Sequence, residues 1–416
     1  MTSSEDAPPS ALLLLPPPPS SPTFTTLNAA YGPALKTALQ ESQTRSSSTK
    51  RAIILDVAIP SGHVFTQQRE PRCALYGPLQ ALVSGLYKLV CFIGSQNEIN
   101  LEDADGVDVR VIPLNYPTRY STVGLESKSE DFEGPLINIQ RLALSSRSWE
   151  TLFAVESEEG LRFCKDFLEV EDTSIKVQHV QGGIVQHASH DRFNQHEGAD
   201  AKAHYSVAVG GTFDHLHIGH KLLLTMTALA CEPPGSSSPR QERTLTVGIT
   251  GDALLKNKKH AEYLGTWNTR EKVITSFLLG ILDFCPKRHS LREKFITTTY
   301  KSVPGPNGHV VSTRLASGIT INCTEIQDPY GPTITDPDIS ALVVSAETRA
   351  GGQAVNTKRA EKGWAGLQVL EVDVLDTEDD EGSRSLEEKE ADSFRTKISS
   401  TEIRRLLAEK AQKATQ

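Results

Sequence analysis

Cysteine is scarce in this chain, and no apolar stretch is long. The 416 residues contain six cysteines, and no two of them form a Cys-x-x-Cys pair. This pattern predicts neither a zinc site nor a disulfide framework, and reduced thiols are typical of a cytoplasmic protein. The apolar run Leu12–Leu15 is followed at once by Pro16–Pro19, whereas a membrane span needs ~20 apolar residues. We therefore expect a cytoplasmic location, without a signal peptide or a membrane span.

Positive charge is also in short supply. Lys and Arg number 43 against 52 Asp and Glu, which gives a net charge of −9. This balance argues against nucleic acid or an anionic membrane as the main partner. A site for an anionic ligand must therefore concentrate basic side chains locally. The chain is long enough for two or three domains.

The first 50 residues are rich in Pro, Ser and Thr. This composition favours a disordered leader over residues 1–50, interrupted at most by a short helix near Pro33–Leu39.

Residues 51–181 have the pattern of an α/β domain, but they contain no chemical motif that reveals a role. Leu79–Ile93 is expected to be a helix that runs into a strand at Lys88–Phe92, and Ser157–Leu168 a second helix with a capping serine. The other expected strands are Ala52–Ile59, Val109–Pro113, Leu152–Val155 and Ile175–Val177.

Residues 182–204 are predicted to be a polar linker. Five histidines lie in or just before it: His179, His187, His190, His196 and His204. We favour a solvated linker over a metal site, because the histidines have no regular spacing and no cysteines beside them.

Residues 205–416 alternate strand-like and helix-like segments, which predicts a Rossmann-like parallel sheet. Asn268 is the expected cap of one helix, and Gly280–Ser317 is expected to be an exposed basic loop. Because Ala201–Gln416 is long enough for its own core, we expect it to fold independently. The expected strands are Tyr205–Gly210, Leu245–Thr250, Ile319–Cys323, Ala341–Val344 and Leu367–Val374, and the expected helices include Gly219–Cys231 and Ala350–Lys362.

The most informative segment is Val207–His220. A short β-branched run ends at Gly210 and Gly211, and His-x-Gly-His then opens an apolar helix. The glycines let the backbone pass close to a ligand. The free N–H groups and positive dipole end of the helix attract phosphate. His217 and His220 lie three residues apart on one face of the first turn, so the segment predicts a nucleoside triphosphate site.

A second motif, Ile-Ser-Ser-Thr-x-x-Arg, spans Ile398–Arg404, about 180 residues after the first. Taken alone, neither motif requires a ligand, because a Ser-Ser-Thr cluster is an ordinary helix cap and short motifs often arise by chance. Together they place two helix N-termini at one edge of a parallel sheet, where both can face the same polyphosphate.

The motif pair resembles the nucleotidyltransferase superfamily. Together with three segments between them, the motifs resemble the eukaryotic-type phosphopantetheine adenylyltransferases, including the adenylyltransferase domain of animal coenzyme A synthase. The resemblance covers roughly Ser206 to Leu407. The intervening segments are Val247–Lys258, Asp328–Pro332 and Leu342–Gly352.

The resemblance implies transfer of adenylyl from ATP to 4′-phosphopantetheine, giving dephospho-coenzyme A and pyrophosphate. Mg²⁺ is expected on the triphosphate, without a dedicated carboxylate cage. The implied catalytic residues are His217, His220 and Lys258. The implied ATP-binding residues are Gly210, Gly211, Phe213, His217, His220, Ser399, Ser400, Thr401 and Arg404. The implied substrate-binding residues are Thr212, Asp214, Lys256, Glu347 and Arg349; spacing alone leaves open whether Lys256 or Lys258 contacts phosphate.

The sequence also bears on whether a kinase domain is present, on alternative functions and on partners. The chain has no Gly-Lys-Ser or Gly-Lys-Thr and ends 12 residues after Arg404, so we expect a monofunctional, fungal-like protein without the kinase domain of the animal proteins. The alternatives are a related nucleotidyltransferase with another phosphate acceptor, and a scaffold that assembles coenzyme A pathway enzymes. Such enzymes are possible partners beside ATP and 4′-phosphopantetheine.

Overall fold

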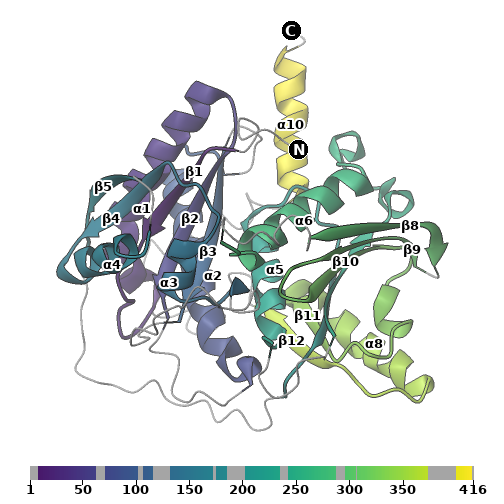
Figure 1. Ribbon diagram of the computed structural model, residues 1–416. Helices are drawn as coiled ribbons and strands as arrows, with labels where there is room; N and C mark the ends of the chain where they lie inside the picture. Colours follow the sequence, from purple (N-terminus) through teal and green to yellow (C-terminus); the bar gives the residue numbers. More distant parts are fainter. Residues whose placement is uncertain are drawn as a thin grey trace, which may run out of the picture.

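The computed structural model describes residues 8–61, 71–101, 106–115, 132–171, 175–184, 202–234, 242–286, 296–305, 307–372 and 400–414. Two α/β domains lie side by side, with helix α5 at the boundary between them (Figure 1). This confirms the predicted α/β fold, with a Rossmann-like parallel sheet and a second sheet domain.

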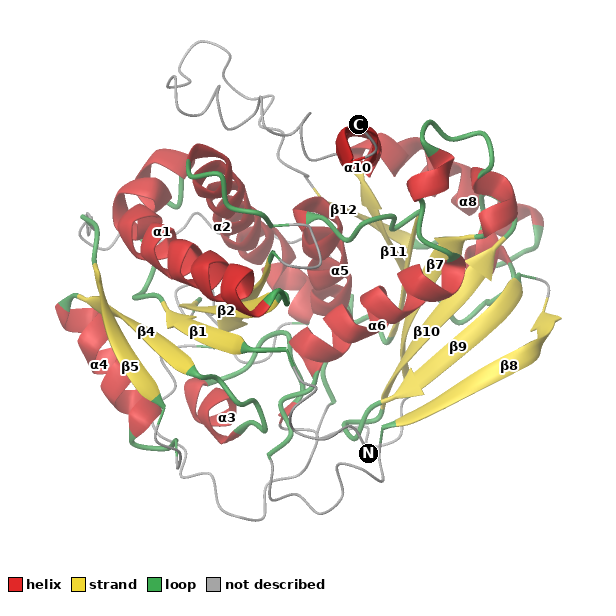
Figure 2. Ribbon diagram, turned by 90° about the horizontal axis from the view of Figure 1, so that it is seen from above, coloured by secondary structure: helices red, strands yellow, loops and turns green. Residues whose placement is uncertain are grey.

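The first domain contains a five-stranded parallel sheet in the order β3-β2-β1-β4-β5. Helices α1 and α2 cover one face of this sheet, and α3 and α4 cover the other (Figure 2). The strands are β1 (Ser10–Leu14), β2 (Ile53–Pro60), β3 (Val107–Leu114), β4 (Thr151–Glu156) and β5 (Lys176–Gln181). The helices are α1 (Phe24–Thr49), α2 (Tyr76–Gln96), α3 (Ile139–Leu144) and α4 (Glu158–Leu168).

The disordered leader predicted for residues 1–50 is wrong for residues 8–50, which contain β1 and α1. Strand β1 lies in the middle of the first sheet, between β2 and β4, and Ala11–Leu15 are fully buried. The Tyr31 hydroxyl of α1 donates to the Pro16 carbonyl oxygen at 2.9 Å. A continuous apolar run is the signature of a parallel strand covered on both faces, and the surrounding Pro and Ser residues obscured it. Residues 1–7 lie outside the described residues.

Helix α2 also differs from the prediction, because it continues through Lys88–Phe92 instead of becoming a strand. In the described part of the chain, Arg72–Gln96 is the one helix long and apolar enough to cross a membrane by length and composition. Its apolar residues have another explanation: they pack between the first sheet and α5, and Leu82, Leu86 and Leu89 are fully buried.

The second domain contains a seven-stranded sheet in the order β12-β11-β6-β7-β10-β9-β8. Its strands are parallel from β12 to β10, and β9 and β8 continue the sheet as an antiparallel hairpin. The strands are β6 (Ser206–Gly211), β7 (Arg243–Thr250), β8 (Thr297–Gly305), β9 (Gly308–Arg314), β10 (Ile319–Ile326), β11 (Ala341–Ser345) and β12 (Gln368–Val372). The helices are α5 (Ile218–Ala230), α6 (Trp267–Leu282), α8 (Arg349–Glu361) and α10 (Ser400–Ala414).

Two further predictions for this domain need correction. The stretch Gly280–Ser317 is not simply an exposed loop, because it contains the β8–β9 hairpin that extends the sheet; residues 287–295 within it lie outside the described residues. Helix α6 is capped by Thr266, whose hydroxyl accepts from the Thr269 N–H, and not by Asn268. Asn268 and Thr266 are both good capping residues, so composition could not separate them.

Most of the predicted linker, residues 185–201, lies outside the described residues, and so do His187, His190 and His196. His204 is buried within the second domain, where its ring nitrogens bond to Ser340 Oγ and Gln368 Oε1 at 2.9 and 2.7 Å. This histidine therefore joins the start of β6 to β11 and β12. One hydrophobic cluster runs through both domains, so they share a core.

Candidate active site

A cavity of about 830 Å³ lies at the carboxyl ends of β6, β7 and β11. This is the edge at which open parallel sheets bind ligands. The sequence-predicted residues that line it are Gly210, Gly211, Thr212, Phe213, His217, His220, Lys258, Glu347, Ser400, Thr401 and Arg404. The two motifs therefore meet at one cavity, although about 180 residues separate them in the sequence.

The turn between β6 and α5 holds the two signature histidines. Phe213 and His215 have φ values of 50° and 48°, in the left-handed region, and these values turn the chain sharply before the helix. The rings of His217 and His220 stack with centroids 3.9 Å apart. The Phe213 ring lies 5.2 Å from His220 and is almost fully buried. Packing therefore fixes both imidazoles at the cavity.

Both signature histidines are neutral at pH 7 in this structure. Burial lowers the pKa of His220 to about 4, only partly offset by its hydrogen bond to His215 and by Asp214. Burial, with smaller effects from His220 and Lys221, also lowers the pKa of His217 well below its usual range. His220 Nδ1 donates to the His215 carbonyl oxygen at 3.3 Å, so the neutral ring carries its free lone pair on Nε2.

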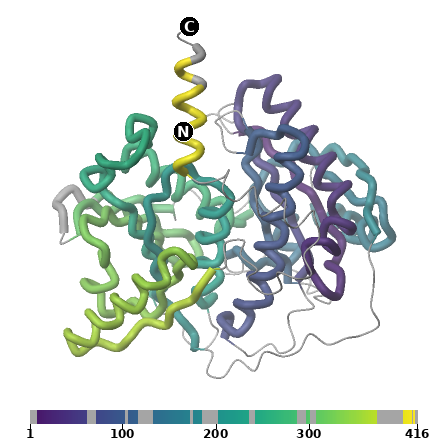
Figure 3. The backbone as a smooth tube through the Cα atoms, turned by 180° about the vertical axis from the view of Figure 1, so that it is seen from behind, coloured from purple at the N-terminus to yellow at the C-terminus, as the bar shows by residue number. Residues whose placement is uncertain are grey.

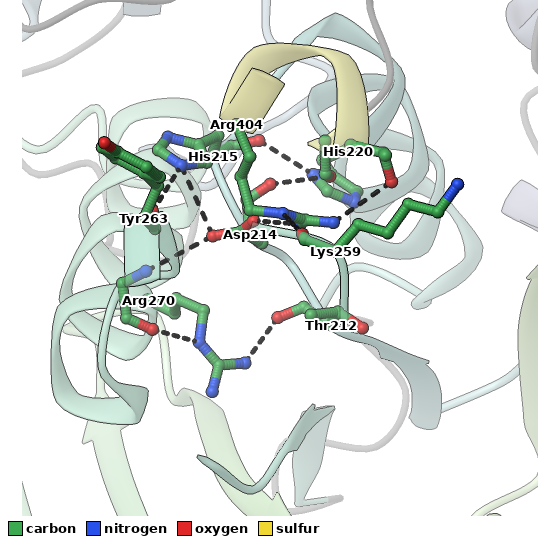
Figure 4. A network of polar contacts seen from close by, with 11 residues as sticks. Thr212, Asp214, His215, His220, Lys259, Tyr263, Arg270 and Arg404 are labelled. Atoms are coloured by element: carbon green, nitrogen blue, oxygen red, sulfur yellow. Dashed lines mark hydrogen bonds and ion pairs between the residues drawn. The ribbon is translucent and has the colours of Figure 1, made fainter. Parts of the chain in front are cut away.

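The C-terminal helix α10 is tied to the signature turn by a buried ion pair (Figure 4). Arg404 Nη1 lies 2.6 Å from Asp214 Oδ2, and both side chains are almost fully buried. Arg404 also donates to the Lys259 carbonyl oxygen and to Thr401 Oγ1, at 3.0 and 3.1 Å. Ser400 Oγ donates to the Asp214 backbone carbonyl oxygen at 2.8 Å. These contacts place the start of α10 at the cavity, and the rest of the helix projects away from the second domain (Figure 3).

The Asp214–Arg404 pair changes the interpretation of both residues. Asp214 was expected to contact substrate, but its carboxylate accepts from Arg404 and lies outside the lining of the cavity. Arg404 lines the cavity, but Asp214 neutralises its charge.

The remaining expected substrate contacts separate into two groups. Thr212, Lys258 and Glu347 line the cavity, whereas Lys256 and Arg349 do not. Lys256 is exposed, and Arg349 Nε donates to Glu371 Oε2 at 2.6 Å. The placement favours Lys258 over Lys256 as the lysine near a bound phosphate. Ser399 lies outside the described residues.

Arg270 supports the site from outside the cavity lining, and the sequence did not indicate this role. This buried arginine of α6 donates to the carbonyl oxygens of Thr212, Thr250 and Gly265, at 2.6, 2.8 and 3.0 Å. It also pairs with Asp252 at 2.7 Å. Arg270 thereby fixes the ends of β6 and β7 (Figure 4). In sequence it looks like any polar residue of an amphipathic helix, and only its burial reveals this role.

The described residues hold no group of three or more His, Cys, Asp or Glu side chains placed to bind a metal ion. The positive features at the cavity are instead the N-termini of α5 and α10 and the side chain of Lys258. Helix N-termini and lysine suit an anionic ligand such as a phosphate group.

The first part of the chain matches a family model. Residues 1–186 match a family model described as "Domain of unknown function (DUF8446)". This match includes β1 and α1, in agreement with their place in the first domain.

Named relatives are similar to about half of the chain. An uncharacterised protein of Schizosaccharomyces pombe is 35% identical over 50% of this chain and 49% of its own length. A "Phosphopantetheine adenylyltransferase" of Saccharomyces cerevisiae is 33% identical over 55% of this chain and 57% of its own. The chain thus spans about half the length of these two relatives.

An archaeal protein is matched over nearly its whole length. The "Phosphopantetheine adenylyltransferase" of Pyrobaculum aerophilum is 28% identical over 49% of this chain and 91% of its own length. A solved structure, described as a protein of unknown function from Archaeoglobus fulgidus, matches 40% of this chain at 23% identity, with a TM-score of 0.25. The named relatives support a nucleotidyltransferase-like family.

Proposed function

We propose that this protein transfers the adenylyl group of ATP to 4′-phosphopantetheine, giving dephospho-coenzyme A and pyrophosphate. The observation that carries the proposal is the meeting of His217 and His220 with Ser400 and Thr401 around one cavity. Relatives named phosphopantetheine adenylyltransferase support this choice of reaction. A cavity of about 830 Å³ is in the range that holds a nucleotide-sized ligand.

In this proposal a phosphate oxygen of the acceptor attacks the α-phosphorus of ATP. One P–O bond forms and the bond to pyrophosphate breaks, so no covalent intermediate with the protein is needed. Catalysis then depends on alignment and on stabilising negative charge. The N-terminus of α5 and the two imidazoles face the α-phosphate region, and Ser400 and Thr401 with the N-terminus of α10 cradle the β- and γ-phosphates.

The bound triphosphate would change the charge of the histidines. Its negative charge favours imidazolium, and so raises the pKa values that burial has lowered. His220 could then donate from Nε2 to an α-phosphate oxygen while Nδ1 keeps its bond to His215. Asp214 acts indirectly in this proposal, by holding Arg404 and α10 against the signature turn.

Lys258 and Thr212 are proposed to face the phosphate of the acceptor, because both line the cavity. Mg²⁺ is proposed to arrive with ATP, bound to the triphosphate oxygens, and to neutralise charge on the leaving pyrophosphate. We propose a cytoplasmic location for the reaction. The scaffold alternative gains no support from the relatives, so we do not propose it.

The test is pyrophosphate release from ATP and Mg²⁺ with a panel of acceptors. The panel contains 4′-phosphopantetheine, pantetheine without its phosphate, and nicotinamide mononucleotide. We expect release with 4′-phosphopantetheine alone, and none from a His217→Ala/His220→Ala double variant. Release with nicotinamide mononucleotide instead would point to the related-nucleotidyltransferase alternative, and no release with any acceptor would refute the proposal.

A further inference from the structure

Helix α5, which carries the signature histidines at its start, is buried on nearly every side. Eleven of its 13 residues are buried, and the two that are not are Gly219 and His220, which line the cavity. The second sheet covers one side of the helix, and α2 of the first domain covers another. The first domain therefore forms part of the environment of the catalytic helix.

An ion pair between a buried lysine and a half-buried aspartate joins the first turn of α5 to the first domain. Lys221, which directly follows His220, is almost fully buried, and its Nζ lies 2.6 Å from Asp108 Oδ1 on β3. Arg110 Nη2 donates to the other carboxylate oxygen of Asp108 at 2.8 Å. Burial alone would raise the pKa of Asp108, but Lys221 and Arg110 outweigh it and lower that pKa to about 2. Asp108 is therefore a carboxylate at any physiological pH.

Further hydrogen bonds near this ion pair strengthen the contact between α5 and the first domain. The Tyr87 hydroxyl of α2 accepts from the Val111 N–H of β3 at 3.2 Å and also interacts with Thr225 of α5. At the far end of α5, Arg72 donates from its backbone N–H to Glu232 at 2.9 Å and from Nη1 to the Cys231 carbonyl oxygen at 3.1 Å. The first domain thus holds the helix at both ends.

We propose that the first domain positions the signature helix for adenylyl transfer, and that Asp108 is a positioning residue acting through Lys221. This inference rests on the proposed function. A buried ammonium group that loses its counter-ion is destabilised, and it either moves towards water or another partner or loses its proton. Because Lys221 adjoins His220 in the helix, such movement displaces the imidazole from the cavity. A shift of about 1 Å in a reacting geometry can reduce a rate by roughly 100-fold.

The test compares three variants of the full chain. Asp108→Asn removes the counter-charge of Lys221 and keeps the shape of the side chain. Lys221→Met removes the ammonium group and leaves Asp108 paired with Arg110, so no buried charge is left unpaired. Glu133→Gln is the matched control, because Glu133 pairs with Arg243 across the same domain boundary, at the opposite end of β7 from the cavity.

For Asp108→Asn we expect kcat to fall about 10- to 100-fold while KM for ATP changes less than about twofold. Lys221→Met should keep thermal stability close to that of the wild type but lose kcat as Asp108→Asn does, because the helix is no longer tied to β3. Glu133→Gln should lower Tm without a matching loss of kcat. Equal losses of kcat in Asp108→Asn and Glu133→Gln, or a normal kcat in Asp108→Asn, would overturn the inference.

One readout does not depend on activity. The ring-proton NMR resonances of His220, assigned with His220→Ala, report its surroundings in the protein without substrate. They should shift in Asp108→Asn and stay in place in Glu133→Gln. If the wild type releases no pyrophosphate with any acceptor, the proposed function fails, whereas an unmoved His220 resonance in Asp108→Asn rejects the positioning role.

Discussion

At the scale of single residues, the site is shaped by how burial changes charge. His217 and His220 are stacked, half-buried at the cavity and neutral, with the pKa of His220 lowered to about 4. The pKa of Asp108 responds differently, because the attraction of Lys221 and Arg110 outweighs the effect of burial and lowers this pKa to about 2. Burial therefore leaves His217 and His220 uncharged in the absence of ligand. Lys221, the residue after His220, instead forms a permanent ion pair with Asp108.

His220→Ala should lower kcat far more than it weakens ATP binding. A donor aimed at charge that develops in the transition state contributes about 2.7–4 kcal/mol, which corresponds to a 10²- to 10³-fold loss of kcat. Steady-state kinetics and calorimetric ATP titration separate the two effects. The control is His309→Ala, since His309 is an exposed histidine on β9. A turnover near that of the wild type would remove His220 from the mechanism.

ATP binding should be accompanied by proton uptake at the two signature histidines. The triphosphate raises pKa values that lie low in the free protein, so the complex holds more protons than the free protein between the free and bound pKa values. ATP affinity should therefore increase as pH falls through that interval. Calorimetry in buffers of different ionisation enthalpy measures the uptake, and His220→Ala subtracts the ionisation of ATP itself. Equal uptake in the variant and the wild type would contradict this account.

At the scale of elements, the structure shows why some parts could be predicted from sequence. Strands β6, β7 and β11 can be recognised in the sequence by short apolar runs that end at or next to glycine or serine. Helix α5 can be recognised by the His-x-Gly-His motif at its start. Strand β1 was missed because its proline-rich surroundings resemble a disordered tail. Arg270 and the Asp214–Arg404 pair were missed because pairing between distant residues has no local signal. The motifs thus located the site, whereas its supporting contacts required the fold.

Asp214→Asn should loosen α10 from the signature turn. The change leaves the Arg404 guanidinium buried without its counter-charge, and breaking a buried pair from one side costs about 3–5 kcal/mol. We expect a lower Tm, faster proteolysis within α10 and weaker ATP binding, because Ser400 and Thr401 move with the helix. Denaturation and limited proteolysis measure these changes.

The neighbouring arginine offers a matched control for that prediction. Arg405 pairs with Glu402 and Glu409 on the exposed side of α10, and exposed pairs contribute little to stability. Arg405→Gln should leave Tm and ATP binding close to those of the wild type. If it behaves like Asp214→Asn, the buried pair has no special role in holding the helix.

At the scale of the whole molecule, the domains are more dependent on each other than the sequence indicated. The polar, histidine-rich stretch between them predicted separable units. The described residues instead share one hydrophobic cluster, and three buried arginine and lysine contacts cross the boundary, at Arg72, Lys221 and Arg243. A linker's composition reports on its own solvation and carries no information about whether the domains it joins are packed together.

Ala201–Gln416 expressed alone should therefore fold poorly, contrary to the expectation from its length. Without the first domain, the face of α5 that packs on α2 meets water, and Lys221 and Arg243 lose their partners Asp108 and Glu133. Exposed apolar surface of this kind drives association. We expect aggregation or a much lower Tm, with pyrophosphate release reduced to the same degree, and partial recovery when residues 1–184 are co-expressed. Sedimentation, thermal unfolding and the pyrophosphate assay test this together. A monomeric fragment with the Tm and activity of the full chain would show that the second domain is autonomous, and that the interface holds the two units together without supporting catalysis.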